Sequence, residues 1–192
     1  MPDTDWWDAS SVCGGRTPID LFWHDLTKHE TLEQHVDGMV SALMAAIHRP
    51  GRLWNPWTSA SAEGEFRSVL KRALVGRLEP MNEVKRIRQS HPAKFYEIRW
   101  QHVRVVDRVE GGMDRRHEVL VRLLHAEPES LPLTMIGLRA HEKTPQGKST
   151  DAESAQHDQI EDATQIYWEL MAEGRFAGLS GVIGYTAHKN GV

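Results

Sequence analysis

The chain has 192 residues, of which 40% are hydrophobic and 26% are charged, and its formal net charge is −4. This composition predicts one folded domain with a sizeable core. It has no apolar run of 18 or more residues, which argues against a transmembrane helix, and its acidic N-terminus does not look like a secretory signal. Cys13 is the single cysteine, so an internal disulfide and a thiolate metal cage are excluded. We therefore expect a cytoplasmic protein without a metal or other cofactor.

The charges are unevenly distributed along the chain. Residues 64–125 contain 14 Lys and Arg against 8 Asp and Glu, whereas the remainder contains 9 against 19. A basic centre between acidic ends suits a polyanionic partner, but an ordinary solvated surface gives the same pattern. Charge alone therefore leaves nucleic-acid binding open.

The first part of the chain predicts a strand and two helices. Residues 1–18 are expected to be a flexible extension, and residues 19–26 alternate in the manner of an edge strand. Thr27 and Glu30 have the spacing of a capping box, and an apolar stripe at helical spacing follows from residue 32 to residue 47. A loop containing Trp54 and Trp57 is then expected to lead into a second helix over residues 62–78.

The second part predicts three consecutive strands and a closing helix. The strands cover residues 95–109, 116–127 and 131–142, and the helix covers residues 151–173. Residues 82–89 are compatible with a turn of helix, a loop or a strand. Strands that follow one another without helices favour an antiparallel meander. We therefore predict an α+β domain over residues 19–175, in which two N-terminal helices pack on a small antiparallel sheet, followed by a tail over residues 176–192.

Four local sequences, in this order, carry a resemblance to a known family. They are KFYEIRW at residues 94–100, EVLVRLLHAEP at 118–128, MIGLRAHEKTP at 135–145 and STDAESAQHDQIEDA at 149–163. The first is similar to an aromatic-Glu-Leu-Arg strand, and the third resembles an apolar strand that ends in basic residues, Thr and Pro. Together they resemble the RelE/HigB-like toxins of type II toxin–antitoxin systems, in particular the phage-derived HigB-type branch, over about residues 19–173.

The resemblance implies a RelE-like fold and a metal-independent endoribonuclease that cuts mRNA on or off the ribosome. It also implies a small helix-turn-helix antitoxin as the protein partner and no role at a membrane. Two positions depart from the family pattern. His117 and Glu118 stand where an aromatic-Arg pair is expected, unless Arg115 or Arg116 takes that place, and Glu142 precedes Lys143 where a doubled lysine is expected.

Cleaving RNA without a metal requires a base, cations that stabilise the phosphorane, and an acid for the leaving 5′-oxygen. The candidate catalytic residues are Arg99, Arg122, Arg139, His141 and Lys143. In this hypothesis the three arginines hold the scissile phosphate, the histidine transfers a proton and the lysine neutralises charge. The alternative for each arginine is solvation or an ion pair with Glu97 or Glu118, and for His141 an ordinary exposed turn histidine.

Further basic residues could follow the RNA backbone. The candidates are Arg67, Lys71, Arg72, Lys85, Arg86 and Arg88. Phosphate contacts of this kind make binding dependent on salt. A solvated helix face is the alternative interpretation for the first three.

Other clusters support weaker hypotheses. The spacing of His24, His29 and His35 does not suit a metal site on one helix. Packing in the core is expected for Trp23, Trp100 and Trp168, whereas the two loop tryptophans could cover the core or meet a partner. The alternative function is a non-catalytic RelE-fold module that binds a protein through its acidic N-terminal region, which contains Trp6 and Trp7.

Overall fold

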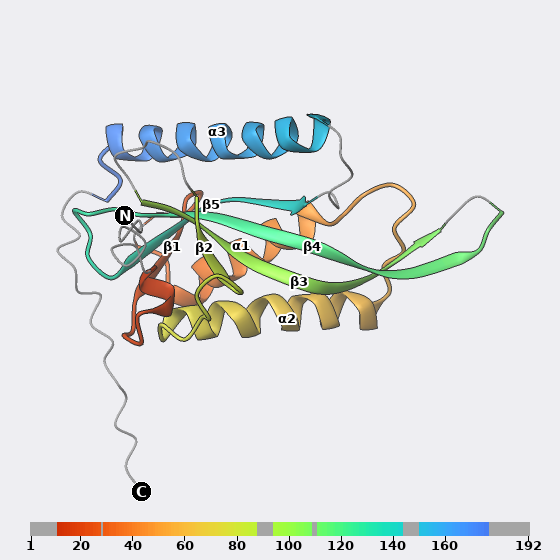
Figure 1. Ribbon diagram of the computed structural model, residues 1–192. Coiled ribbons are helices and arrows are strands. Elements are labelled where there is room, and N and C mark those ends of the chain that lie inside the picture. The colour runs from red at the N-terminus through yellow and green to blue at the C-terminus, as the bar shows by residue number, and fades with distance from the viewer. Residues whose placement is uncertain (1–10, 28, 88–93, 109–110, 144–149, 177–192) are drawn as a thin grey trace, which may run out of the picture.

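The computed structural model describes residues 11–27, 29–87, 94–108, 111–143 and 150–176 (Figure 1). The elements in chain order are η1 (Val12–Gly14), β1 (Asp20–Trp23), α1 (Leu32–Ala46), α2 (Pro56–Leu74), β2 (Val84–Arg86), β3 (Lys94–Arg108), β4 (Asp114–Glu127), β5 (Thr134–Lys143) and α3 (Thr150–Ala172). Among the helices described, none is long and apolar enough to cross a membrane.

One five-stranded sheet organises the chain, with the strand order β1-β5-β4-β3-β2. The neighbours from β5 to β2 are antiparallel, which confirms the predicted meander of three long strands. The first strand, β1, runs parallel to β5, because two helices carry the chain between it and the rest of the sheet. The α+β class is confirmed, but the expectation of a purely antiparallel sheet is wrong.

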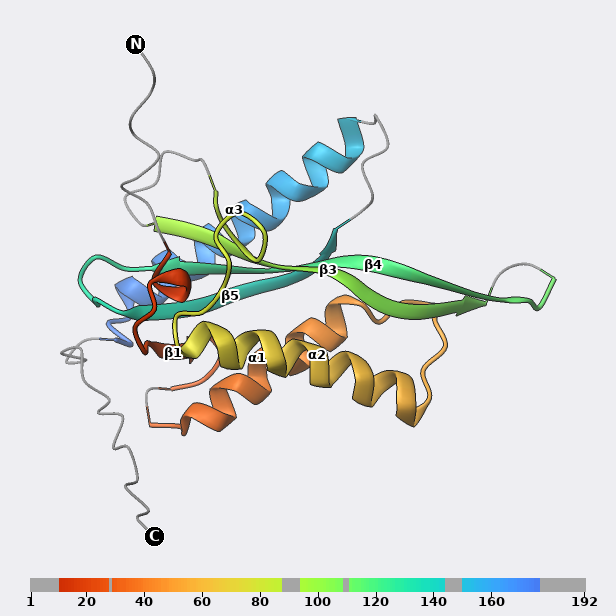
Figure 2. The same ribbon diagram turned by 60° about the horizontal axis from the view of Figure 1, so that its bottom comes forward.

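Helices lie on both faces of this sheet (Figures 1 and 2). On one face, α1 contacts β1, β4 and β5, and α2 contacts β3. On the opposite face α3 contacts β4 and β5. Each face has its own apolar core, one built around Phe66, Trp100 and Met135 and the other around Phe95, Leu124 and Tyr167. The sheet therefore separates two apolar cores, one on each of its faces.

The first helix, α1, lies where the sequence predicts it, but the N-terminal caps of α1 and α2 differ from the prediction. Thr31 and Gln34 form the capping box of α1, so the prediction that Thr27 and Glu30 form it is wrong. Helix α2 begins at Pro56 rather than near residue 62, because the Asn55 side chain accepts hydrogen bonds from the backbone N–H groups of the first turn. Residues 56–61, predicted as loop, are therefore helical.

The tryptophans are only partly as predicted. Trp23 and Trp100 are buried, which confirms their expected packing role, but Trp168 is 45% exposed, and its assignment to the core is wrong. Trp57 lies in the first turn of α2, not in a loop, and is 86% exposed. Residues 11–18, which fall within the predicted extension, contain η1 and the fully buried Cys13.

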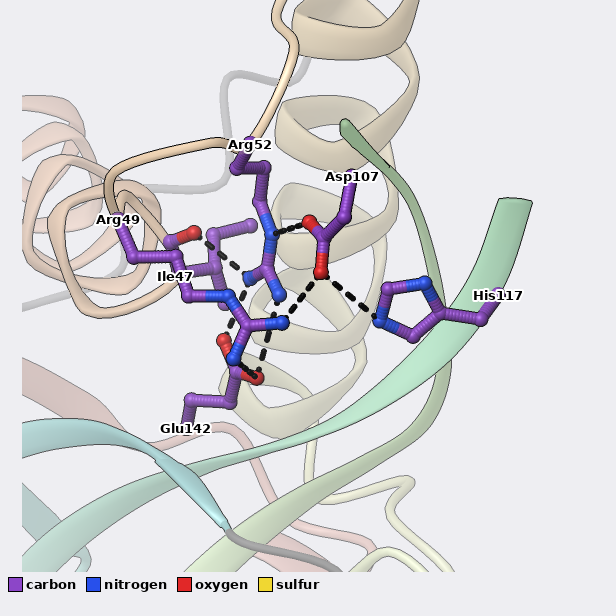
Figure 3. Close-up of polar contacts among 6 residues, drawn as sticks. All are labelled: Ile47, Arg49, Arg52, Asp107, His117 and Glu142. Atoms are coloured by element: carbon purple, nitrogen blue, oxygen red, sulfur yellow. Dashed lines mark hydrogen bonds and ion pairs between the residues drawn. The ribbon is translucent and has the colours of Figure 1, made fainter. Parts of the chain in front are cut away.

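A buried arginine connects the loop after α1 to the ends of two strands, β3 and β5 (Figure 3). Its guanidinium, on Arg52, is fully buried: Nε lies 2.9 Å from Asp107 Oδ1, and Nη1 lies 2.5 Å from Glu142 Oε2 and 2.8 Å from the Ile47 carbonyl oxygen. Arg49 pairs with the same two carboxylates from a half-exposed position. The network thus connects β3 and β5 to the helical layer, with every charge compensated.

The Arg52→Met variant should lose about 3–5 kcal/mol of unfolding free energy, because two carboxylates are left with only a half-exposed partner. Arg49→Ala removes that half-exposed partner instead and should cost less than about 1 kcal/mol. Urea denaturation followed by circular dichroism measures both. Equal losses in the two variants would contradict the role given to the buried arginine.

Candidate anion-binding site

Three polar side chains from three strands lie in one row across the sheet. Arg99 on β3 is directly opposite Arg122 on β4, which is directly opposite His141 on β5. Residues that pair directly in a sheet project from the same face. The structure therefore brings together three of the five residues predicted as catalytic.

A β-bulge sets the direction of the side chains at the end of β5. The pairing shifts between Leu124, which is opposite Arg139, and His125, which is opposite Gly137. The extra residue, Leu138, is fully buried in the core under α3. From Arg139 onwards, alternation places every second residue on the α3 side of the sheet, so Lys143 joins the row there.

The polar atoms of this row are incompletely satisfied. Arg122 is 2% exposed and donates through Nη1 to the carbonyl oxygens of Trp100 and Val121, at 3.2 and 2.8 Å. Its Nε finds no hydrogen-bond partner in the part of the chain that the structure describes, and the same holds for Nε of Arg99 and both ring nitrogens of His141. Buried polar groups nearly always have partners, so such a concentration indicates a place for water or a ligand.

One carboxylate, on Glu97, partly balances these cations. Its oxygens lie 3.4 Å from Nε of Arg99 and 3.8 Å from Nε of Arg122. We call Arg99, Arg122, His141 and Lys143, together with Glu97, the cationic cluster. With the histidine neutral, its three cations and one carboxylate leave a net charge of +2.

Burial and mutual repulsion shift the acidities of the cluster. Burial, reinforced by the cations of Arg122, Lys143 and Arg139, lowers the pKa of His141 to about 4. Burial also lowers the pKa of Lys143, with the nearby arginines acting in the same direction and Glu97 opposing them. The charged forms of His141 and Lys143 are therefore disfavoured by the neighbouring arginines, and a bound anion would relieve that repulsion.

The remaining predicted catalytic residue, Arg139, is engaged by α3. Its Nε donates to Gln159 Oε1 at 3.1 Å, and its Nη2 lies 3.4 Å from Asp162 Oδ2. The side chain contributes to the positive potential at His141, but its guanidinium is turned towards the helix. Arg139 thus anchors α3 beside the cluster, and the structure does not bring it into the row.

The predicted backbone-binding residues are divided. Arg67 pairs with Asp37 at 2.5 Å, and Arg72 donates to Glu83 at 2.7 Å, so both helix arginines serve contacts within the fold. The exposed ones are Lys71, Lys85 and Arg86, while Arg88 lies outside the described residues. A groove of about 470 Å³ between α2 and β3 is lined by residues that include Glu65, Arg72, Glu83, Arg99 and His102. Arg99 is the one member of the cationic cluster among its lining residues, and the other members lie towards the α3 side of the sheet.

Two features of this region could not be read from the family pattern. The arginine beside Arg99 is Arg122, four residues beyond Glu118, whose carboxylate instead lies 2.7 Å from Nδ1 of His102. Glu142 does not stand beside Lys143 as a competing charge, because alternation turns it to the opposite face and into the Arg52 network. Pairing register, which decides both points, has no signal in a single strand's sequence.

The three histidines considered for a metal are used separately. His35 is buried and accepts a hydrogen bond from the Trp23 backbone N–H, and His24 lies 3.3 Å from Asp25. Within the described ranges, one group of residues has donor atoms close enough to hold a metal ion, and it consists of Cys13, His125 and Glu127. The sequence predicted no metal, and these three residues gave no signal because more than 110 positions separate the first from the others.

Comparison with protein-family models found no match for the chain, and neither curated proteins nor solved structures gave one. Function is therefore argued from the arrangement of the side chains.

The low pKa of His141 predicts a specific pH dependence of stability. Its folded-state pKa of about 4 lies below the ordinary value of 6.5, so the unfolded chain takes up the proton first as the pH falls. Stability should decrease by up to about 3 kcal/mol between pH 6.5 and pH 4, with no contribution from this group above pH 6.5. The His141→Gln variant should lose this part of the decrease.

Urea denaturation across this pH range measures the effect, and His102→Gln, at an exposed histidine, serves as the matched control. Identical pH profiles for the two variants would show that His141 does not titrate in this environment.

Proposed function

We propose that this chain is the toxin component of a type II toxin–antitoxin system, a RelE/HigB-like endoribonuclease that cleaves mRNA without a metal ion. The observation that carries the proposal is the row of Arg99, Arg122 and His141, with its unsatisfied donors and its net positive charge. The order of the elements supports it, since a strand, two helices, three long antiparallel strands and a helix follow one another as the resemblance implies, with the short strand β2 added before the three.

Phosphate recognition falls to the two arginines of the row. Arg99 and Arg122 are paired on neighbouring strands, and their Nε atoms have no hydrogen-bond partner within the described ranges. Guanidinium groups match the oxygens of a phosphodiester, and such charge-assisted hydrogen bonds are stronger than neutral ones. The phosphorane carries more negative charge than the diester, so a net charge of +2 favours the transition state over the substrate.

Proton transfer falls to His141. With a pKa of about 4 the imidazole is neutral at pH 7 and has a free lone pair to accept the proton of the ribose 2′-hydroxyl. The 2′-oxygen then attacks phosphorus, and the bond to the 5′-oxygen breaks. An anion bound beside the ring raises the pKa of His141 again, because it favours the imidazolium form. The ammonium group of Lys143 gives a proton to the leaving 5′-oxygen and so neutralises it, and the products carry a 2′,3′-cyclic phosphate and a 5′-hydroxyl.

The partners rest on the resemblance and on the surface charge. Lys71, Lys85 and Arg86 are exposed and can contact the backbone of mRNA next to the groove. A small helix-turn-helix antitoxin is the inhibitor that the resemblance implies, and the reaction is placed in the cytoplasm, on or off the ribosome.

A second candidate is a non-catalytic protein-binding module of the same fold. The deep burial of Arg122, with two carbonyl groups as partners, favours it, because an arginine used to support the sheet would look the same. The acidic N-terminal region with Trp6 and Trp7, the docking element in this alternative, lies outside the described residues.

Substitutions at Arg99 and His141 distinguish the two candidate functions. Arg99→Gln and His141→Gln should each reduce RNA cleavage by about 10²–10⁴-fold, because one removes a phosphate ligand and the other the base. Cleavage of a defined RNA by the purified protein, without added divalent metal, is measured beside growth arrest in cells. The controls are Arg104→Gln and His102→Gln, which change exposed residues of β3, the strand that carries Arg99. Full toxicity in both row variants would refute the site.

Expression with and without the neighbouring open reading frame tests the partner. The proposal expects growth arrest by this chain alone and relief when the neighbour encodes a helix-turn-helix protein. Harmless expression together with a stable complex of the two proteins would instead support the binding module.

A further inference from the structure

We propose that Cys13, His125 and Glu127 form a binding site for a divalent transition-metal ion, with Zn²⁺ as the best match. His125 and Glu127 lie at the end of β4, and Cys13 belongs to η1. Alternation along β4 turns these two residues to the α1 and α2 side of the sheet, opposite to Arg122. The site is thus separate from the cationic cluster and goes beyond the proposed function.

The donor atoms already have nearly the spacing that zinc requires. They all lie within 4.8 Å of one another, with Cys13 Sγ 3.9 Å from His125 Nε2, which is 3.2 Å from Glu127 Oε1. A tetrahedral ion with bonds of roughly 2.0–2.3 Å separates its ligands by roughly 3.3–3.8 Å. An ion can therefore bind once the donor atoms, which all lie within 4.8 Å of one another, move closer together by up to roughly 1 Å.

The three ligands are buried, and neighbouring groups fix the positions of two of them. Cys13 and His125 are fully buried, and Glu127 is 6% exposed. The Ser11 hydroxyl donates to Oε1 of Glu127, and the Val12 N–H lies 3.2 and 3.1 Å from its two oxygens. The His125 ring stacks on Tyr96, with an interplanar angle of 19°. Contacts of this kind orient metal ligands in known sites.

The charge and the polarisability of the donor atoms favour a particular kind of metal ion. A thiolate and a carboxylate supply two negative charges, which balance a divalent cation in a buried place. Thiolate and imidazole donors favour zinc over magnesium or calcium, which prefer oxygen ligands. Met135 adds a further soft donor, with its Sδ 3.4 Å from Cys13 Sγ.

The same residues do not suit a catalytic thiol. Cys13 has no exposed surface, and burial, together with the charge of Glu127, raises the pKa of its thiol. A reactive cysteine needs an accessible thiolate, so nucleophilic chemistry is excluded here. A bound cation would instead fix η1 to the end of β4, beside the hydrogen bond from the Leu78 N–H to the Cys13 carbonyl oxygen.

Metal analysis of the purified full chain tests the proposal. Protein from zinc-supplemented medium should contain about one zinc per chain, and cobalt should give the absorption of a Co²⁺–thiolate bond. Cys13→Ser, which keeps the side chain's size, should weaken metal binding by at least about 100-fold, more than the loss of an outer contact typically costs. His35→Gln alters a buried histidine outside the proposed metal site and should leave the metal content unchanged.

Thermal unfolding provides a second readout. A chelator should lower the melting temperature of the wild-type chain and leave that of Cys13→Ser unchanged, because only the former loses a bound ion. The proposal is overturned if the wild type binds zinc and cobalt no better than Cys13→Ser, or if cobalt shows no thiolate band. RNA cleavage is read separately, so failure here would leave the proposed function standing.

Discussion

The buried guanidinium of Arg52 is the interaction on which the arrangement of the sheet's far end depends. It holds Asp107 on β3 and Glu142 on β5 against the loop that follows α1. Because side chains alternate along a strand, fixing Glu142 on this side commits His141 and Lys143 to the other side. A structural ion network on one face of the sheet therefore determines the direction of the cationic cluster on the opposite face.

The same alternation of side chains decides on which face of the sheet each group of polar residues lies. On β4, Arg122 belongs to the α3 side, whereas His125 and Glu127 belong to the side of α1 and α2. A single strand thus supplies a cation to one cluster and, three and five positions further along, two metal ligands on the opposite face. Changes at one cluster can be made without touching the other, which is what allows their roles to be tested independently.

Sequence patterns predicted the parts of this structure that depend on local period. The three long strands are predicted correctly, because alternation is visible within a few residues. The parallel pairing of β1, the bulge at Leu138 and the opposition of Arg99 to Arg122 depend on register between distant segments. The start of α2 was missed although Asn55 and Pro56 form a recognisable N-terminal signal, because the tryptophans beside them were interpreted as loop residues.

The cationic cluster is a place where stability and binding are opposed. Without an anion, its cations repel one another and several of its buried atoms have no hydrogen-bond partner among the described residues, so the cluster itself disfavours the folded state. The two apolar cores and the Arg52 network offset that cost elsewhere in the sheet. A phosphate group bound in the cluster would turn this unfavourable contribution to stability into a favourable one, because each cation is attracted to the phosphate. In the proposed reaction, relief of the repulsion between cations contributes to binding of the phosphate, and it contributes more as negative charge accumulates on the oxygens of the phosphorane.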